Sequence, residues 1–224
     1  MFTNRSEIFS HRIYDVFKSI NNLDINYDNL RLNNNFMNIG VNFKFLGTID
    51  PQPLIESLSK IEDVDWGADT FRQDTYKGIH SATQAIHLIY DTDFRHFNGT
   101  KHKYWSLLNM EELLKPVMES LKKEYGPGYL ARAVFVKLFA GKNVARHIDV
   151  GGSYTLSHRI HISLIAEEDN IIYIVRDEDK TFKLGEIWEI NDMVEHEVKN
   201  NSQTDRINLI MDYATLDGKG WWWK

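Results

Sequence analysis

The sequence predicts a mainly β protein with flanking helices, in which short strands form a sandwich or a barrel. From about residue 129 onward, strand-like segments follow one another at short spacing and turn residues separate them. Many short strands at regular spacing are typical of those two architectures. Helical patterns, in contrast, lie mainly in the first half of the chain. The expected strands are YLARAVFVKLF, VARHID, HRIHISLIA, IIYIVRD, GEIWEI, HEV and RINLIMDY.

The chain is expected to hold one main domain behind an N-terminal extension. Residues 1–42 are polar and rich in asparagine, and we expect them to pack on the main domain, residues 43–224. Residues 43–50 (FKFLGTID) predict the first strand. A helix is expected directly after it, because Pro51 suits the first turn of a helix.

Loop, strand and helix signals follow in turn before the β region. Residues 63–75 are polar and are expected to form a loop, and residues 79–91 alternate as a strand does. Asn109 and Glu112 resemble a capping pair at the start of a helix. Pro116 is expected to kink that helix or to start a second one.

Composition limits the classes of partner. The net charge is −6 and the pI about 5.8, which argues against nucleic acid as a partner. The chain has no cysteine, so disulfides and thiolate metal sites are excluded. It shows neither a secretory signal nor an apolar run of membrane-spanning length. We therefore expect a cytoplasmic protein with neither nucleic acid nor a membrane as its partner.

Polar side chains gather on one face of two neighbouring expected strands. Residues i and i+2 of a strand share a face, so His147 and Asp149 point the same way, as do Arg159 and His161. A further histidine, His196, follows later in the same β region. Two histidines and one carboxylate around a metal with open positions form the facial triad of non-heme Fe(II) oxygenases. His147, Asp149 and His196 are therefore the candidate metal ligands and catalytic centre.

A 2-oxoglutarate co-substrate would require a buried cation for its far carboxylate, best supplied by a bidentate arginine. Arg206 stands at the head of RINLIMDY, shortly after His196. A strand that returns antiparallel to HEV would bring Arg206 beside the metal. Arg206 is therefore the candidate anchor of that carboxylate.

The segment from Gly141 to Tyr213 resembles the aspartyl/asparaginyl β-hydroxylase family of Fe(II)- and 2-oxoglutarate-dependent dioxygenases. The matching pieces are HIDVGG, RIHISL, KTFKLGEIWEINDMVEHEV and DRINLIMDY. The resemblance implies a double-stranded β-helix (jelly-roll or cupin-like) core over about residues 129–213.

The resemblance also implies roles for single residues. It makes His147 and His196 iron ligands and Arg206 the anchor of 2-oxoglutarate. Arg159 and His161 match the RxH motif of the family, which lies close to the co-substrate. Asp149 argues against the related halogenases, which need the place of that carboxylate for halide.

The expected enzyme is thus a 2-oxoglutarate-dependent dioxygenase with Fe(II) as its metal and 2-oxoglutarate and O2 as co-substrates. It would hydroxylate an amino-acid side chain. The turn VGGSYTLSH is longer than in the animal enzymes of the family, so both an Asp/Asn-type residue in a peptide and a free amino acid such as proline stay open. Two alternatives remain. One is a zinc-dependent hydrolase that uses the same three ligands, and the other is a non-catalytic β-barrel module that binds a small molecule.

Two other stretches carry candidate residues. HSATQAIHL places His80, Thr83, Gln84 and His87 upstream of the β region, where an outer strand often borders a substrate mouth. The C-terminal GWWWK holds three consecutive tryptophans, which we expect to pack on the barrel or on the N-terminal extension.

Overall fold

The computed structural model describes residues 39–90, 99–149 and 157–216. The chain divides into two units, Met1–Phe36 and Met37–Lys224, and all described residues belong to the second. The expected extension therefore lies almost entirely outside the described residues. The same holds for most of the turn VGGSYTLSH and for the C-terminal tryptophans.

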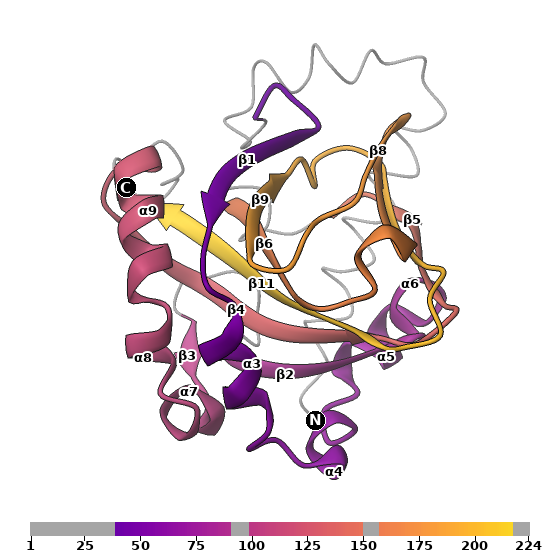
Figure 1. Ribbon diagram of the computed structural model, residues 1–224, viewed down its shortest axis with the longest axis horizontal. Coiled ribbons are helices and arrows are strands. Elements are labelled where there is room, and N and C mark those ends of the chain that lie inside the picture. The colour runs from indigo at the N-terminus through magenta and orange to yellow at the C-terminus, as the bar shows by residue number, and fades with distance from the viewer. Residues whose placement is uncertain (1–38, 91–98, 150–156, 217–224) are drawn as a thin grey trace, which may run out of the picture. The chain divides into compact units, whose positions relative to one another are not determined.

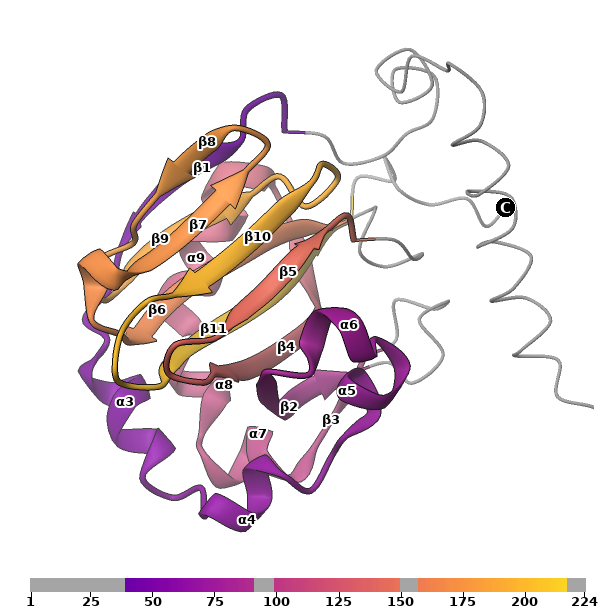
Figure 2. The ribbon, with the colours of Figure 1, turned by 90° about the vertical axis from the view of Figure 1, so that its right-hand side faces the viewer.

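The described strands form two antiparallel sheets that face each other (Figures 1 and 2). The larger sheet has seven strands in the order β1 (Phe43–Thr48), β9 (Glu186–Ile190), β6 (His158–Ile165), β11 (Arg206–Thr215), β4 (Gly128–Leu138), β2 (Thr83–Tyr90) and β3 (Thr100–Lys101). The smaller sheet has four strands in the order β5 (Asn143–His147), β10 (His196–Asn200), β7 (Ile171–Val175) and β8 (Glu178–Lys180). Successive strands from β4 to β11 mostly alternate between the sheets, as in a double-stranded β-helix. The predicted fold class is confirmed.

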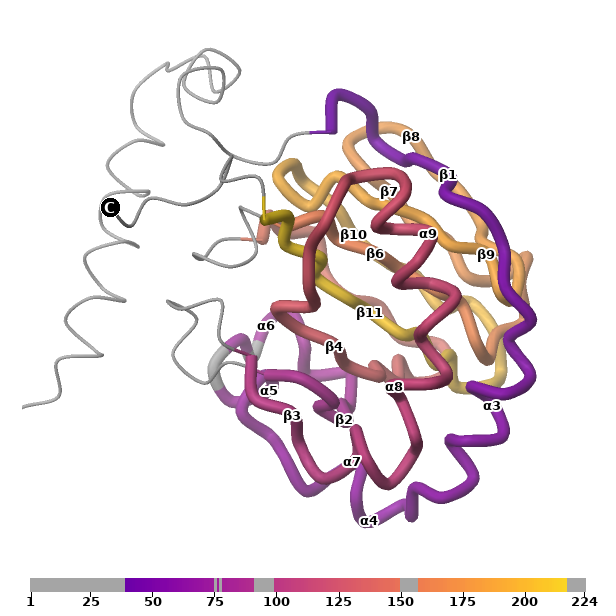
Figure 3. Tube along the Cα trace, turned by 90° about the vertical axis from the view of Figure 1, so that its left-hand side faces the viewer, coloured from indigo at the N-terminus to yellow at the C-terminus, as the bar shows by residue number. Residues whose placement is uncertain are grey.

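The two faces of the larger sheet differ in chemistry. On β11, Ile207, Leu209 and Met211 face outward and join the main hydrophobic cluster. That cluster also takes in Val117 and Leu121 of α9 (Lys115–Tyr125), which lies across the outer face of this sheet (Figure 3). Because side chains of a strand alternate, the residues in between face the other sheet. The inner face of the larger sheet is therefore free to carry polar groups.

Helices flank the larger sheet and come mainly from the first half of the chain, as expected. Their bounds are α3 (Gln52–Leu58), α4 (Asp63–Trp66), α5 (Phe71–Thr75), α6 (Lys77–His80), α7 (Lys103–Leu107), α8 (Met110–Leu113) and α9, with a short 3₁₀ turn, η2 (Glu168–Asn170), between β6 and β7. None of the helices in the described ranges has the length and apolar character needed to span a membrane.

The structure corrects two local predictions. Residues 63–75 are not simply a loop but contain α4 and α5, and α4 begins at a capping box between Glu62 and Asp65. Asn109 makes no side-chain cap and adopts a left-handed backbone with φ of 55°. The expected second helix at Pro116 is found, since that proline occupies the first turn of α9.

Candidate metal centre

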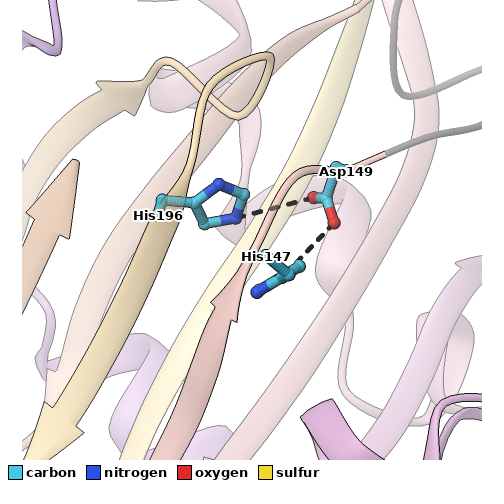
Figure 4. Close-up of side chains that lie close together, drawn as sticks. All are labelled: His147, Asp149 and His196. Atoms are coloured by element: carbon cyan, nitrogen blue, oxygen red, sulfur yellow. Dashed lines mark ion pairs between the residues drawn. The ribbon is translucent and has the colours of Figure 1, made fainter. Parts of the chain in front are cut away.

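The two candidate histidine ligands come from neighbouring strands of the smaller sheet. His147 is the last residue of β5 and His196 the first of β10, and the two lie directly opposite in the strand pairing. Their ring centroids are 4.3 Å apart (Figure 4). Antiparallel pairing thus brings together two residues that are far apart in the sequence.

Backbone carbonyls fix the protonation of both rings. Nδ1 of His147 lies 2.7 Å from the carbonyl oxygen of Ala145, and Nδ1 of His196 lies 2.9 Å from that of Val194. A carbonyl oxygen can only accept, so each Nδ1 carries the proton and donates it. Each Nε2 then keeps a lone pair. This is the tautomer in which a second partner orients a metal-ligating histidine.

Asp149 completes the group just beyond the end of β5. Its amide donates to the carbonyl oxygen of Asp192 at 3.1 Å. Its Oδ1 lies 3.3 Å from Nε2 of His147, and its Oδ2 lies 4.0 Å from Nε2 of His196 (Figure 4). One ligand atom from each of the three residues falls within 4.8 Å of the others. The three side chains that the sequence singled out therefore converge on one place that could hold one metal ion.

The protonation states around this place suit a cation. Burial lowers the pKa of His196 to about 4, so its imidazole is neutral at neutral pH. Burial opposes ionisation of Asp149, but Arg159 and the two histidines lower the pKa of this carboxyl well below its ordinary value. The group thus offers the neutral imidazole of His196 and the carboxylate of Asp149 beside the ring of His147.

Arg159 of β6 contacts the candidate ligand Asp149 directly. Its Nη1 donates to Oδ2 of Asp149, and its Nε donates to Oδ1 of Asp212 at 2.7 Å. Its Nε also lies 3.3 Å from Oδ2 of Asp192. Burial, together with the nearby carboxylates of Asp149 and Asp212, raises the pKa of Asp192 well above its ordinary value, against the effect of Arg159. The predicted contact of Arg159 with a co-substrate stays a prediction.

Arg206 is the largest fully buried side chain of the described residues and is only 2% exposed. Its Nη2 donates to the hydroxyl of Tyr173 on the facing sheet, and its guanidinium carbon lies 5.1 Å from the centre of that ring. Within the described residues, its Nε has no hydrogen-bond partner and no carboxylate forms an ion pair with it. Of the two aspartates near it in sequence, Asp205 accepts the amide of Ala140, and Asp212 pairs with Arg159.

His161 lies on the same inner face as Arg206, as the sequence predicts. Its Nδ1 accepts a hydrogen bond from the side-chain amide of Asn208 at 3.0 Å. Burial, with the nearby charges of Arg206 and Arg159, lowers the pKa of His161 well below its ordinary value. His161 is therefore neutral, and its role toward a co-substrate stays a prediction.

Of the candidate residues in HSATQAIHL, His80 lies beside a candidate metal ligand and His87 pairs with an aspartate. His80 ends α6, and its ring centroid is 5.6 Å from that of His147. Burial lowers the pKa of His80 to about 2. His87 lies on β2, 3.5 Å from the carboxylate of Asp69, and the hydroxyl of Thr83 donates to the carbonyl oxygen of His80. Contact of these residues, or of Gln84, with a substrate stays a prediction.

Sequence reasoning missed two residues of the inner face. Asp212 is fully buried and pairs with Arg159, and its Oδ2 also lies 2.7 Å from Nε of Arg132. One signal was present in the sequence, because Asp212 has the same strand parity as Arg206 and Asn208. Arg132 carried no comparable signal, because its place depends on how β4 pairs with β11.

One comparison with known proteins covers the part of the chain that holds this site. Residues 109–215 match the sequence model of the aspartyl/asparaginyl β-hydroxylase family. Among curated proteins, none matches the chain closely enough to count as a relative.

Several solved structures are similar in part. An oxidoreductase of the 2OG-Fe(II) oxygenase family from Burkholderia pseudomallei is 12% identical, with 75% of this chain and 91% of that chain covered and a TM-score of 0.49. A non-heme monooxygenase in a nickel complex is 17% identical, with coverages of 78% and 74% and a TM-score of 0.48. A prolyl-4-hydroxylase from Pseudomonas putida is 9% identical, with coverages of 78% and 92% and a TM-score of 0.46. At these values the likeness says nothing about substrate or cofactor.

The resemblance predicted from the sequence is therefore confirmed by the family match, which spans both strands of the metal centre and Arg206. Residues 109–215 are accordingly similar to the aspartyl/asparaginyl β-hydroxylase family, and this similarity supports an oxidoreductase of the hydroxylase type.

Proposed function

We propose that this protein is an Fe(II)- and 2-oxoglutarate-dependent dioxygenase that hydroxylates an amino-acid side chain. The observation that carries the proposal is the combination of two features on facing sheets. His147, Asp149 and His196 converge within 4.8 Å, and Arg206 is a buried cation to which the described residues supply no carboxylate.

The donor set fits iron. Two imidazole nitrogens and one carboxylate that leave other positions open are the ligands of non-heme Fe(II) oxygenases. His147, Asp149 and His196 would hold the metal, and bound iron would supply the activation of O2 that the side chains cannot provide. The carbonyls of Ala145 and Val194 keep both Nε2 atoms available for it.

Arg206 supports 2-oxoglutarate as the co-substrate. A buried guanidinium without an anionic partner is costly, and a carboxylate can satisfy it through two parallel hydrogen bonds. The far carboxylate of 2-oxoglutarate would supply that partner, with the Tyr173 hydroxyl holding the other side of the guanidinium. A zinc hydrolase needs only a metal and a water at the centre. The buried cation therefore favours the dioxygenase over that alternative.

The substrate is proposed at the level of its class. The family match supports hydroxylation of an amino-acid side chain, either within a peptide or protein or on a free amino acid. His161 and Asn208, which bond to each other beside Arg206, would border the co-substrate rather than the substrate.

Binding of 2-oxoglutarate tests the proposal before the substrate is known. Calorimetric titration of the full chain loaded with Mn(II) is expected to show one 2-oxoglutarate site, which metal-free protein and His196→Ala lack. Succinate release would then be screened with free amino acids and with peptides that contain Asp, Asn or Pro. Binding of 2-oxoglutarate that is equally tight without metal would contradict the proposal.

A further inference from the structure

A row of alternating charges crosses the inner face of the larger sheet beside the metal centre. Arg159 of β6 lies directly opposite Asp212 of β11, which in turn lies directly opposite Arg132 of β4. Nε of Arg159 donates to Oδ1 of Asp212 at 2.7 Å, and Nε of Arg132 lies 2.7 Å from Oδ2 of the same carboxylate. All three side chains are buried. We call these three residues the charge row.

One end of the charge row reaches the candidate metal ligand. Nη1 of Arg159 donates to Oδ2 of Asp149, while its Nε donates to Asp212. Asp149 itself lies past the end of β5, and its backbone amide donates to the carbonyl oxygen of Asp192 at 3.1 Å. Side chains contact both oxygens of its carboxylate, Arg159 on one and His147 on the other.

We propose that Arg159 is a positioning residue for the metal-binding carboxylate. The charge row fixes the guanidinium, and the guanidinium fixes Asp149 in the orientation in which it faces the Nε2 atoms of His147 and His196. The proposal rests on the metal site of the proposed function. It gives Arg159 a role toward the metal, which differs from the contact with 2-oxoglutarate that the sequence motif implies.

The contact between Arg159 and Asp149 can affect metal binding in two opposite ways. Whether its loss weakens or strengthens metal binding tells which effect is larger. If Arg159 positions Asp149, loss of the contact leaves the carboxylate to be ordered during metal binding, which weakens binding. If Arg159 only neutralises Asp149, its cation competes with the metal, and loss of the contact strengthens binding.

Two variants perturb the charge row without leaving a gap. Arg159→Lys keeps the charge but lacks the planar fork that reaches both Asp149 and Asp212. Asp212→Asn keeps the shape and a hydrogen-bond acceptor but removes the charge that holds Arg159. Arg146→Met is the matched control. Arg146 precedes His147 on the same strand but pairs with Glu197 on the surface, so this change removes a nearby cation and leaves the charge row intact.

The experiment is a calorimetric titration of the metal-free full chain with Co(II), followed by 2-oxoglutarate at saturating metal. We expect Co(II) to bind about 10–100-fold more weakly to Arg159→Lys, the usual effect of losing a partner behind a metal ligand. A smaller loss in the same direction is expected for Asp212→Asn, and none for Arg146→Met. The affinity of the metal-saturated variants for 2-oxoglutarate should equal that of the wild type. Circular dichroism of the metal-free variants checks that they fold. If Arg159→Lys does not fold, the Co(II) affinity of Asp212→Asn tests the positioning role by itself.

Three results would overturn the positioning role. Tighter or unchanged Co(II) binding in both charge-row variants would show that Arg159 is only a counter-ion. Unchanged Co(II) binding with weaker 2-oxoglutarate binding would assign Arg159 to the co-substrate. An equal loss of Co(II) affinity in Arg146→Met would show that any nearby cation has the same effect and that the contact with Asp149 is not the cause. The variant His147→Ala separates this inference from the proposed function. If His147→Ala keeps wild-type Co(II) affinity, the proposed metal site is wrong. If His147→Ala loses affinity while both charge-row variants keep it, the metal site stands and only the positioning role of Arg159 is wrong.

Discussion

Replacing Arg206 by methionine should make the metal-free protein more stable and the co-substrate site weaker. In the wild type, the buried guanidinium donates to a neutral hydroxyl, that of Tyr173, and its Nε lacks a partner among the described residues. The effective cost of burying an uncompensated ion is several kcal/mol. Loss of one hydrogen bond to a charged group costs about 1.5–3 kcal/mol. The difference predicts that Arg206→Met raises the free energy of unfolding by about 1–3 kcal/mol.

The same substitution should lower the affinity for 2-oxoglutarate. Two charge-assisted hydrogen bonds to a carboxylate, at about 1.5–3 kcal/mol each, correspond to a loss of roughly 100- to 20,000-fold. Urea unfolding of metal-free protein measures the first effect, and calorimetry of Mn(II)-loaded protein measures the second. Tyr173→Phe is the control. It removes the hydroxyl that accepts from Arg206 but keeps the buried guanidinium, so it should destabilise the protein where Arg206→Met stabilises it. A destabilised Arg206→Met protein that binds 2-oxoglutarate normally would refute the reasoning, since Arg206 would then be a structural residue.

Three further changes have defined outcomes. His196→Ala should abolish succinate release, because it removes a metal ligand, and the test is a coupled assay at saturating Fe(II). Burial lowers the pKa of His87 from 6.5 to about 4. As pH falls from 6.5 to about 4, His87 is protonated in the unfolded chain but still neutral in the folded protein. The free energy of unfolding therefore falls over this pH range, by at most about 1.4 kcal/mol per pH unit for this residue. His87→Leu should flatten that dependence in urea titrations at several pH values. Glu189 accepts hydrogen bonds at 2.6 Å from both Tyr125 and His158. Glu189→Ala should lower the free energy of unfolding by about 2–6 kcal/mol, because it leaves two donors without their acceptor, as measured with urea.

The strands and the metal ligands were accessible from the sequence because both depend on parity. The alternation in RINLIMDY assigns Arg206 and Asn208 to one face and Leu209 to the other, and the structure places them so. The HxD spacing likewise predicts that His147 and Asp149 point to the same place, and they do so although β5 ends at His147. The pairing of β10 with β5, which sets His196 opposite His147, was not predicted. The expected return of RINLIMDY beside HEV is wrong, because β11 pairs with β4 and β6 in the larger sheet whereas β10 belongs to the smaller one.

The charge row could not be predicted in the same way. Parity says which face a residue occupies, but only register says which residue it meets across the sheet. Arg159, Asp212 and Arg132 become neighbours through the pairing of β6, β11 and β4, which are distant in sequence. The short helices α4 and α5 were missed for another reason. Their sequence is polar, and the local signal was the capping box of Glu62 and Asp65 rather than a hydrophobic repeat.

The central claim is that His147, Asp149 and His196 hold iron to which 2-oxoglutarate binds. The most direct measurement is an anaerobic titration of the metal-free full chain with Fe(II) and then with 2-oxoglutarate, followed by visible absorption. A weak metal-to-ligand charge-transfer band should appear only when both are present and should be missing in His147→Ala. Bound Fe(II) without such a band would contradict the claim and favour the hydrolase, and a band that persists in His147→Ala would place the iron elsewhere.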